Sequence, residues 1–135
     1  MKQPLDNPNI KETMPRTILV VEDDDLNFNY IDIVMELEGL TVLWAKNGVE
    51  AIALFDQHPE ISIILMDIRM PAMDGYEATR QIRTRNSTIP IIAITAFAQL
   101  SDKEKSLDAG CNDYLSKPVR KDDLLKAIYK HLPKQ

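Results

Sequence analysis

The chain has 135 residues, which suits one hydrophobic core of ordinary size and leaves no room for a second. Its formal net charge of −5 and pI of about 5.0 exclude general electrostatic attraction to nucleic acid or to an anionic membrane. The single cysteine, Cys111, cannot form an internal disulfide, and no apolar run approaches the ~20 residues of a spanning helix. We therefore expect a cytoplasmic protein without membrane insertion.

Residues 1–15 differ in composition from the rest of the chain. They carry Pro4, Pro8 and Pro15 among polar residues and lack the apolar centre of a secretory signal. We expect a flexible N-terminal lead-in over residues 1–15 and a single domain over residues 16–135. No internal repeat or low-complexity segment divides the domain.

Five segments of the domain have the composition of β-strands. Residues 18–21, 61–66 and 91–94 are apolar at consecutive positions, as expected of strands that are covered on both faces. Residues 41–45 form a further β-rich run, which we expect at an edge of the sheet. Residues 113–116 form a short fifth run.

Helical patterns alternate with these runs. The first helix is predicted from apolar residues at three- and four-residue steps, namely Leu26, Tyr30, Ile33, Val34 and Leu37. It is expected to stop at Gly39. Further helices are predicted from near Asn47, from near Asp74, over roughly residues 98–109 and around residues 124–132. The alternation predicts an α/β fold with five helices around a five-stranded, parallel, doubly wound sheet in the flavodoxin-like order 2-1-3-4-5.

Reactive polar residues follow four of the predicted strands. Glu22 and Asp23 come after the first, and Asp67 comes after the third. Thr95 ends the fourth strand, and Lys117 follows the fifth. Ligands of open α/β sheets bind just outside the carboxyl ends of the strands, near the point where strand order reverses. Three carboxylates, a hydroxyl and an ammonium are therefore expected in one crevice.

The predicted strand order places Asp23 and Asp67 across the crevice from each other. Two carboxylates about 4 Å apart repel by roughly 4 kcal/mol at an effective dielectric constant of about 20. A bound proton, Lys117 or a metal must offset this repulsion. An all-oxygen site with space for water favours Mg²⁺ over Zn²⁺. A bound Mg²⁺ would draw in a phosphate, and one carboxylate could then attack phosphorus and become an acyl phosphate.

Four motifs occur in order along the chain. They are Val20-Val21-Glu22-Asp23-Asp24, the stretch from Met66-Asp67 to Asp74-Gly75, the pair Thr95-Ala96, and Tyr114-Leu115-Ser116-Lys117-Pro118. Together they resemble the receiver domain of two-component response regulators, and the resemblance covers about residues 17–132. Lys117-Pro118 alone would indicate nothing, but the four motifs in this order are specific.

The resemblance implies a role for each residue of the crevice. Asp67 would be the phosphoacceptor. Mg²⁺ would be ligated by Asp23, by Asp67 and by the backbone carbonyl of Arg69, with Glu22 acting partly through water. Lys117 would pair with a phosphoryl oxygen, and its peptide bond to the next residue would be cis.

The resemblance also implies a switch that reads the phosphoryl group. Thr95 and Ala96 would bind the phosphoryl oxygens, and movement of Thr95 would be coupled to Tyr114, which could otherwise be a simple core aromatic. The changed surface would lie over residues 98–105 and 121–129. Arg69 and Phe97 stand where side chains can admit or obstruct attacking water, so they would tune the lifetime of the phosphorylated form.

The implied function is that of a phosphoryl-accepting signalling module. Its partners would be a histidine kinase or a histidine phosphotransfer protein, which donates the group, and a downstream protein effector; nucleic acid is not expected. It would be no enzyme beyond its own phosphorylation and dephosphorylation. Both a stand-alone response regulator and the receiver of a hybrid sensor histidine kinase fit. A lead-in that begins at Met1, and a last helix too near Gln135 for a following DNA-binding module, favour the first.

Two other classes of function share some of these features. A flavodoxin-like electron carrier has the same fold, but it needs a hydroxyl- and glycine-rich phosphate loop where this chain has residues 22–25. An aspartyl-phosphate hydrolase of the haloacid dehalogenase class would use the spacing of Asp23 and Asp25. No insertion large enough for the cap of such a hydrolase is present.

Several polar and aromatic residues are expected to have only structural roles. Asp24 and Asp25 are predicted to cap the first helix and to interact with its dipole, and Asp74 is predicted to cap the third. Trp44 is interpreted as a packing residue, and Cys111 as a small buried one.

Overall fold

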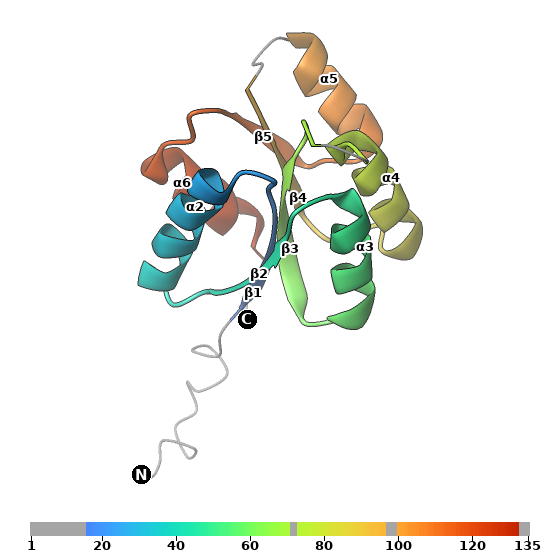
Figure 1. Cartoon of the computed structure of the whole chain (residues 1–135). Helices are drawn as coiled ribbons and strands as arrows, with labels where there is room; N and C mark the ends of the chain where they lie inside the picture. The colour runs from blue at the N-terminus through green and yellow to red at the C-terminus, as the bar shows by residue number, and fades with distance from the viewer. Residues whose placement is uncertain (1–15, 71–72, 97–99, 133–135) are drawn as a thin grey trace.

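The computed structural model describes residues 16–70, 73–96 and 100–132. In these ranges five strands and five helices alternate along the chain (Figure 1). They are β1 (Thr17–Val21), α2 (Asp25–Leu37), β2 (Thr41–Ala45), α3 (Gly48–Gln57), β3 (Ile61–Asp67), α4 (Gly75–Arg85), β4 (Ile91–Thr95), α5 (Leu100–Ala109), β5 (Asp113–Ser116) and α6 (Lys121–His131). The lead-in predicted for residues 1–15 lies outside the described residues.

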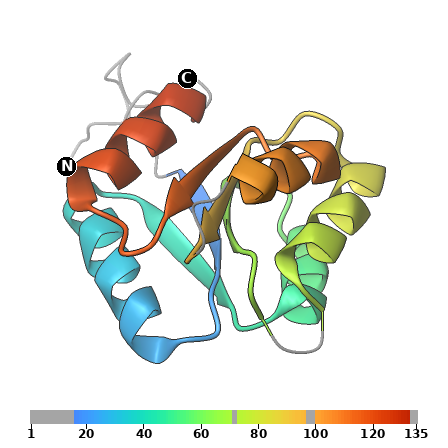
Figure 2. The same ribbon diagram turned by 90° about the horizontal axis from the view of Figure 1, so that it is seen from above.

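The strands form one parallel sheet in the order β2-β1-β3-β4-β5, which confirms the predicted fold and the edge position of β2. Helices α2 and α6 cover one face of the sheet, and α3, α4 and α5 cover the other (Figures 1 and 2). The register pairs Val21 with Met66, Asp67 with Ile94, and Thr95 with Ser116. The carboxyl ends of β1, β3, β4 and β5 therefore lie along one edge.

Alternation of side chains along the strands divides the core into two layers. Ile18 and Val20 of β1 pack toward α2 and α6, whereas Leu19 and Val21 pack toward α3 and α4. Cys111 is buried in the second layer, as predicted. None of the helices in the described part of the chain has the length and apolar character needed to cross a bilayer.

Helix α2 forms where predicted, but it turns a different face to the sheet. Its buried residues are Phe28, Ile31, Val34 and Met35. Only Val34 belongs to the apolar repeat that predicted the helix, and the other four residues of that repeat are exposed: Leu26 by 77%, Tyr30 by 40%, Ile33 by 59% and Leu37 by 72%. Two apolar stripes interleave on this helix, and spacing alone cannot say which stripe meets the core.

The predicted caps fix where the helices begin. Asp24, Asn47 and Asp74 each accept a hydrogen bond from the backbone amide three residues further on, at 2.9–3.0 Å. Asp25 follows in the first turn of α2, where a negative charge favours the helix dipole. At the start of α4, a Cβ on Gly75 would lie 2.5 Å from the backbone oxygen of Asp67, so only glycine allows this approach.

Candidate functional site

Three carboxylates meet at the carboxyl ends of β1 and β3, which are neighbouring strands. Glu22 and Asp23 directly follow β1, and Asp67 is the last residue of β3. One carboxylate oxygen from each of the three lies within 4.8 Å of those of the other two. Glu22 and Asp67 are each only 1% exposed, whereas Asp23 is exposed. The cluster thus joins two buried acids to one that faces solvent.

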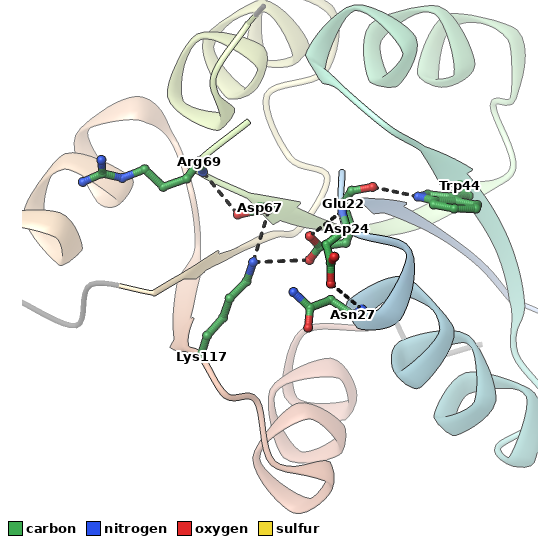
Figure 3. A network of polar contacts seen from close by, with 7 residues as sticks. All are labelled: Glu22, Asp24, Asn27, Trp44, Asp67, Arg69 and Lys117. Carbon is green, nitrogen blue, oxygen red and sulfur yellow. Dashed lines mark hydrogen bonds and ion pairs between the residues drawn. The ribbon is translucent and has the colours of Figure 1, made fainter. Parts of the chain in front are cut away.

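An ammonium group completes the cluster. The Nζ atom of Lys117 lies 3.3 Å from Oδ2 of Asp67 and 3.5 Å from Oε1 of Glu22 (Figure 3). Lys117 directly follows β5, and its backbone amide donates to the carbonyl of Thr95 at 2.7 Å. The peptide bond between Lys117 and Pro118 is cis, as predicted.

Burial and mutual repulsion change the acidity of these groups. Burial, reinforced by the charge of Asp67, raises the pKa of Glu22 to about 7. Burial also raises the pKa of Asp67, although Lys117 opposes the shift. Burial acts to lower the pKa of Lys117, but the charges of Asp67 and Glu22 outweigh it and the pKa is raised. Two buried acids share one ammonium, so the crevice favours a further proton or cation.

Backbone amides hold both buried carboxylates in place. Oδ1 of Asp67 accepts a hydrogen bond from the amide of Arg69 at 3.2 Å, and Oε2 of Glu22 accepts one from the amide of Asp24 at 3.2 Å. The guanidinium of Arg69 points away from the carboxylates (Figure 3). The backbone of Arg69 thus lies beside Asp67, and its carbonyl as a metal ligand stays a prediction.

The fourth strand brings a hydroxyl to the same edge. Thr95 is 1% exposed and ends β4, one residue beyond Ile94, the register partner of Asp67. Ala96 follows and is exposed. Phe97, predicted to tune the lifetime of the phosphorylated form, lies outside the described residues. The register therefore places Thr95 and Ala96 at the same edge of the sheet as Asp67, and their contact with a phosphoryl group stays a prediction.

Tyr114 lies farther from the carboxylates. It is a half-buried residue of β5 that pairs with Ala93, two positions before Thr95. The Nζ atom of Lys103 on α5 lies 5.8 Å from the centre of its ring. Tyr114 thus connects β5 to α5, and its coupling to Thr95 stays a prediction.

The family of the chain follows from comparison with known proteins. The family model of the response regulator receiver domain matches residues 18–129. The polar-differentiation response regulator DivK of Brucella anthropi is 35% identical over 121 residues, which cover 88% of this chain and 98% of DivK. The chain belongs to the response regulator receiver domain family. The resemblance found in the sequence is thereby confirmed.

Solved receiver domains share its architecture. The receiver domain of a sensor histidine kinase from Pseudomonas aeruginosa, solved with magnesium in its active site cleft, has a TM-score of 0.81 and 37% identity, and the match covers 87% of this chain and 98% of that one. The receiver domain of the response regulator Ssk1 from Saccharomyces cerevisiae was solved with the histidine phosphotransfer protein Ypd1. It has a TM-score of 0.82 and 32% identity, and the match covers 87% of this chain and 88% of that one. Similar proteins thus include both a response regulator and a receiver from a sensor kinase.

One residue of this receiver domain has a polar contact that the sequence analysis missed. Trp44 packs as expected, since its ring stacks on Phe28 with centroids 3.9 Å apart and an interplanar angle of 2°. Its indole N–H also donates to the backbone carbonyl of Glu22 at 2.8 Å. The sequence did contain a signal for this hydrogen bond. Trp44 carries an N–H group and lies near the end of residues 41–45, the strand that the predicted order places beside the first strand.

Two cavities open beside the carboxylates. The first, of about 320 Å³, lies between α2 and the loop after β5 and is lined by Glu22, Asn27, Tyr30, Ile31, Ile94, Lys117, Pro118 and Val119. The second, of about 620 Å³, lies toward α4 and α5, and Asp23, Arg69 and Asp74 are among its lining residues. Tyr30 belongs to the exposed stripe of α2, so the first cavity connects that stripe with the buried Glu22.

Proposed function

We propose that this receiver domain accepts a phosphoryl group on Asp67 from the phosphohistidine of a histidine kinase or a histidine phosphotransfer protein. The observation that carries the proposal is a buried carboxylate at the end of β3, with the Nζ atom of Lys117 at 3.3 Å and two further acids beside it. Receiver domains are signalling modules, and the chemistry proposed for this one is limited to its own phosphorylation and dephosphorylation. The free thiol of Cys111 is compatible with the cytoplasmic location that we propose.

The acidic cluster fits a hard divalent cation. Its three ligand oxygens lie within 4.8 Å of one another, and an all-oxygen set with one exposed acid suits Mg²⁺ with retained water. We assign Asp23, Asp67 and the backbone carbonyl of Arg69 as direct ligands, and Glu22 as a ligand through water. When bound, Mg²⁺ would neutralise negative charge and hold phosphoryl oxygens. The magnesium reported for the similar Pseudomonas receiver supports the assignment.

The protein side chains then have separate tasks in phosphoryl transfer. An oxygen of Asp67 attacks phosphorus and forms a P–O bond, while the P–N bond to the donor imidazole breaks and the imidazole nitrogen takes up a proton. The ammonium of Lys117, already beside Asp67, pairs with a phosphoryl oxygen. The hydroxyl of Thr95 donates a hydrogen bond to another phosphoryl oxygen, and Ala96, the next residue, also binds the phosphoryl group. Arg69 and Phe97 limit the access of water that would hydrolyse the acyl phosphate.

The exposed stripe of α2 is the surface that we propose for the phosphodonor. It consists of Leu26, Tyr30, Ile33 and Leu37, which are 40–77% exposed. Contiguous exposed apolar residues mark protein interaction sites, and the cavity lined by Tyr30 extends from this stripe to Lys117, whose Nζ atom lies 3.3 Å from the acceptor Asp67. The proposed occupant is an apolar helix face of the histidine phosphotransfer protein or kinase. The complex solved for the Ssk1 receiver supports a partner of this class.

The output of the domain is proposed to leave on the other side of the crevice. Attachment of the phosphoryl group would draw Thr95 inward and free space for Tyr114, which would change α5, β5 and α6. A ligand shifts such an equilibrium only through contacts that differ between the two states. The downstream effector would therefore contact residues 100–105 and 121–129, while residues 98 and 99 of the predicted surface lie outside the described residues.

Replacement of the acceptor tests the proposal directly. Asp67→Asn keeps the shape of the side chain, so the fold should persist while Mg²⁺-dependent labelling by acetyl phosphate disappears. Asp74→Asn is the matched control, because asparagine also caps helices and Asp74 lies near the same crevice. It should be labelled like the wild type. Equal labelling of Asp67→Asn and the wild type would overturn the assignment.

A second variant tests the cation site. Asp23→Ala deletes a direct ligand, so it should weaken Mg²⁺ binding in a calorimetric titration and slow labelling of Asp67. Unchanged Mg²⁺ affinity would contradict the ligand set while leaving Asp67 as acceptor.

A further inference from the structure

Strand β2 binds both backbone polar groups of Glu22. The amide of Glu22 donates to the carbonyl of Ala45 at 2.9 Å, and its carbonyl accepts the indole N–H of Trp44 at 2.8 Å (Figure 3). The register of β1 and β2 ends at the pair of Val21 and Ala45. The carbonyl of Glu22 therefore lies beyond that register, and a side chain supplies the hydrogen-bond donor there.

The indole ring is itself held in a fixed orientation. Its face stacks on Phe28 of α2, which is 8% exposed, with an interplanar angle of 2°. The Nζ atom of Lys46, in the loop after β2, lies 4.7 Å from the ring centre and 3.7 Å from Oδ1 of Asp25. An aromatic ring held between a stacked ring and a cation has little freedom to rotate. Its N–H is thus aimed at one acceptor.

The accepted hydrogen bond fixes the peptide between Glu22 and Asp23. In Figure 3 the carbonyl of Glu22 points toward Trp44, whereas its carboxylate points toward Lys117. The direction in which the next residue, Asp23, leaves the strand depends on the orientation of this peptide. Asp23 is the exposed member of the acidic cluster, so its position relies on the backbone more than on packing of its own side chain.

We propose that Trp44 is a positioning residue for the cation site: its indole N–H holds the Glu22–Asp23 peptide so that both carboxylates face Asp67. The inference rests on the proposed role of these acids as Mg²⁺ ligands. By this inference, the edge strand β2 helps to preorganise the cation site, although β2 supplies none of the carboxylates of that site. A residue that only packs would affect the stability of the fold and leave Mg²⁺ affinity unchanged.

The test compares Mg²⁺ affinity with stability in matched variants. Trp44→Phe keeps a ring against Phe28 and removes the N–H, and it should raise the Kd for Mg²⁺ roughly two- to tenfold, the range expected for one lost hydrogen bond. Val42→Ala is the control, because Val42 lies on the same strand and packs against the same core. It should lower the free energy of unfolding, measured by urea without Mg²⁺, and keep the wild-type Kd in calorimetry.

A second substitution separates the N–H from the shape of the ring. β-(3-Benzothienyl)alanine at position 44 replaces the indole N–H by sulfur in a ring of nearly equal size, and it should raise the Kd by the same factor even if Trp44→Phe folds poorly. Because Trp44 is the sole tryptophan, its emission in the wild type should also change on Mg²⁺ binding. Wild-type affinity in both variants, or an equal loss in Val42→Ala, would overturn the inference alone. A wild type that binds no Mg²⁺ would overturn the proposed cation site as well.

Discussion

The two sides of the crevice present surfaces of opposite character. On one side, α2 exposes Leu26 by 77%, Ile33 by 59% and Leu37 by 72%. On the other, α5 exposes charged residues at 103, 104, 105 and 108, and among its described residues the one exposed large apolar side chain is Leu107, at 47%. The apolar side suits a partner whose affinity is insensitive to charge in the crevice. The charged side, which we propose is coupled to the crevice through Thr95 and Tyr114, suits a partner whose affinity depends on that charge.

The largest expected effect comes from a charge placed on the apolar side. Ile33→Asp should lower the rate of phosphotransfer from a phosphorylated histidine phosphotransfer protein at least about tenfold, because docking would desolvate the new carboxylate. Labelling by acetyl phosphate should not change. The measurement is single-turnover transfer of radiolabelled phosphate from the fastest donor of a panel.

Leu107→Asp gives the matched control for this variant. It places the same charge at an exposed leucine of α5 and should leave donor transfer at the wild-type rate. Equal losses in the two variants would break the distinction between the two surfaces.

The next effect concerns transmission to the charged side. Thr95→Ala removes the buried hydroxyl at the end of β4, so it should still accept phosphoryl while transmitting the change poorly. With a beryllofluoride mimic at Asp67, wild-type amide NMR shifts should reach residues 100–105, and those of Thr95→Ala should stay near the crevice. Ser116→Ala, at the exposed register partner of Thr95, serves as control. Wild-type shifts that never reach α5 would refute the switch.

A smaller effect tests the crevice that both surfaces share. The pKa of Glu22 is raised from 4.5 to about 7, so the folded state binds this proton more tightly than the unfolded chain. The resulting stability is fully present below pH 4.5 and is lost as the pH rises through 7. Glu22→Gln should therefore lose less stability than the wild type between pH 5 and pH 8, by on the order of 1 kcal/mol without Mg²⁺.

Urea unfolding at the two pH values measures the difference. Glu36→Gln, at an exposed acid of α2, should keep the wild-type pH dependence. If Glu22→Gln and the wild type lost the same free energy of unfolding between pH 5 and pH 8, ionisation of Glu22 would not affect stability.

The smallest expected effect concerns a hydrogen bond between α6 and the end of α2. The hydroxyl of Tyr129 on α6 donates to the carboxylate of Glu38, just after α2, and both residues are exposed. Tyr129→Phe should cost less than about 1 kcal/mol of stability and leave donor transfer within twofold of the wild type. A larger change in transfer would mean that α6 belongs to the donor surface as well.

The parts of the structure that follow local rules could be predicted from the sequence. Continuous apolar runs predict buried parallel strands, and their order places Asp23, Asp67 and Lys117 at one edge. The helix caps follow from Asp24 and Asp74, because a side chain needs only the amides three residues away.

Other features depend on distant parts of the chain. The face that α2 turns inward depends on how its two apolar stripes fit the sheet. The hydrogen bond of Trp44 depends on the register of β1 with β2 and on the placement of Phe28. The raised pKa of Glu22 depends on burial by elements that come later in the sequence. None of these can be read from neighbouring residues.

The buried cysteine allows local opening on the charged side of the crevice to be measured by thiol labelling. Cys111 is 5% exposed, its amide donates to the carbonyl of Ser106 at 2.9 Å, and burial raises the pKa of its thiol. Its Sγ atom lies 3.7 Å from Oγ1 of Thr79 on α4, so a thiol reagent can reach it only when the packing of α4 and α5 on the sheet opens locally. The labelling rate therefore measures how often this opening happens. The ratio of the labelling rates of Cys111 with and without a phosphoryl mimic at Asp67 would give the change in the free energy of local opening that phosphorylation causes.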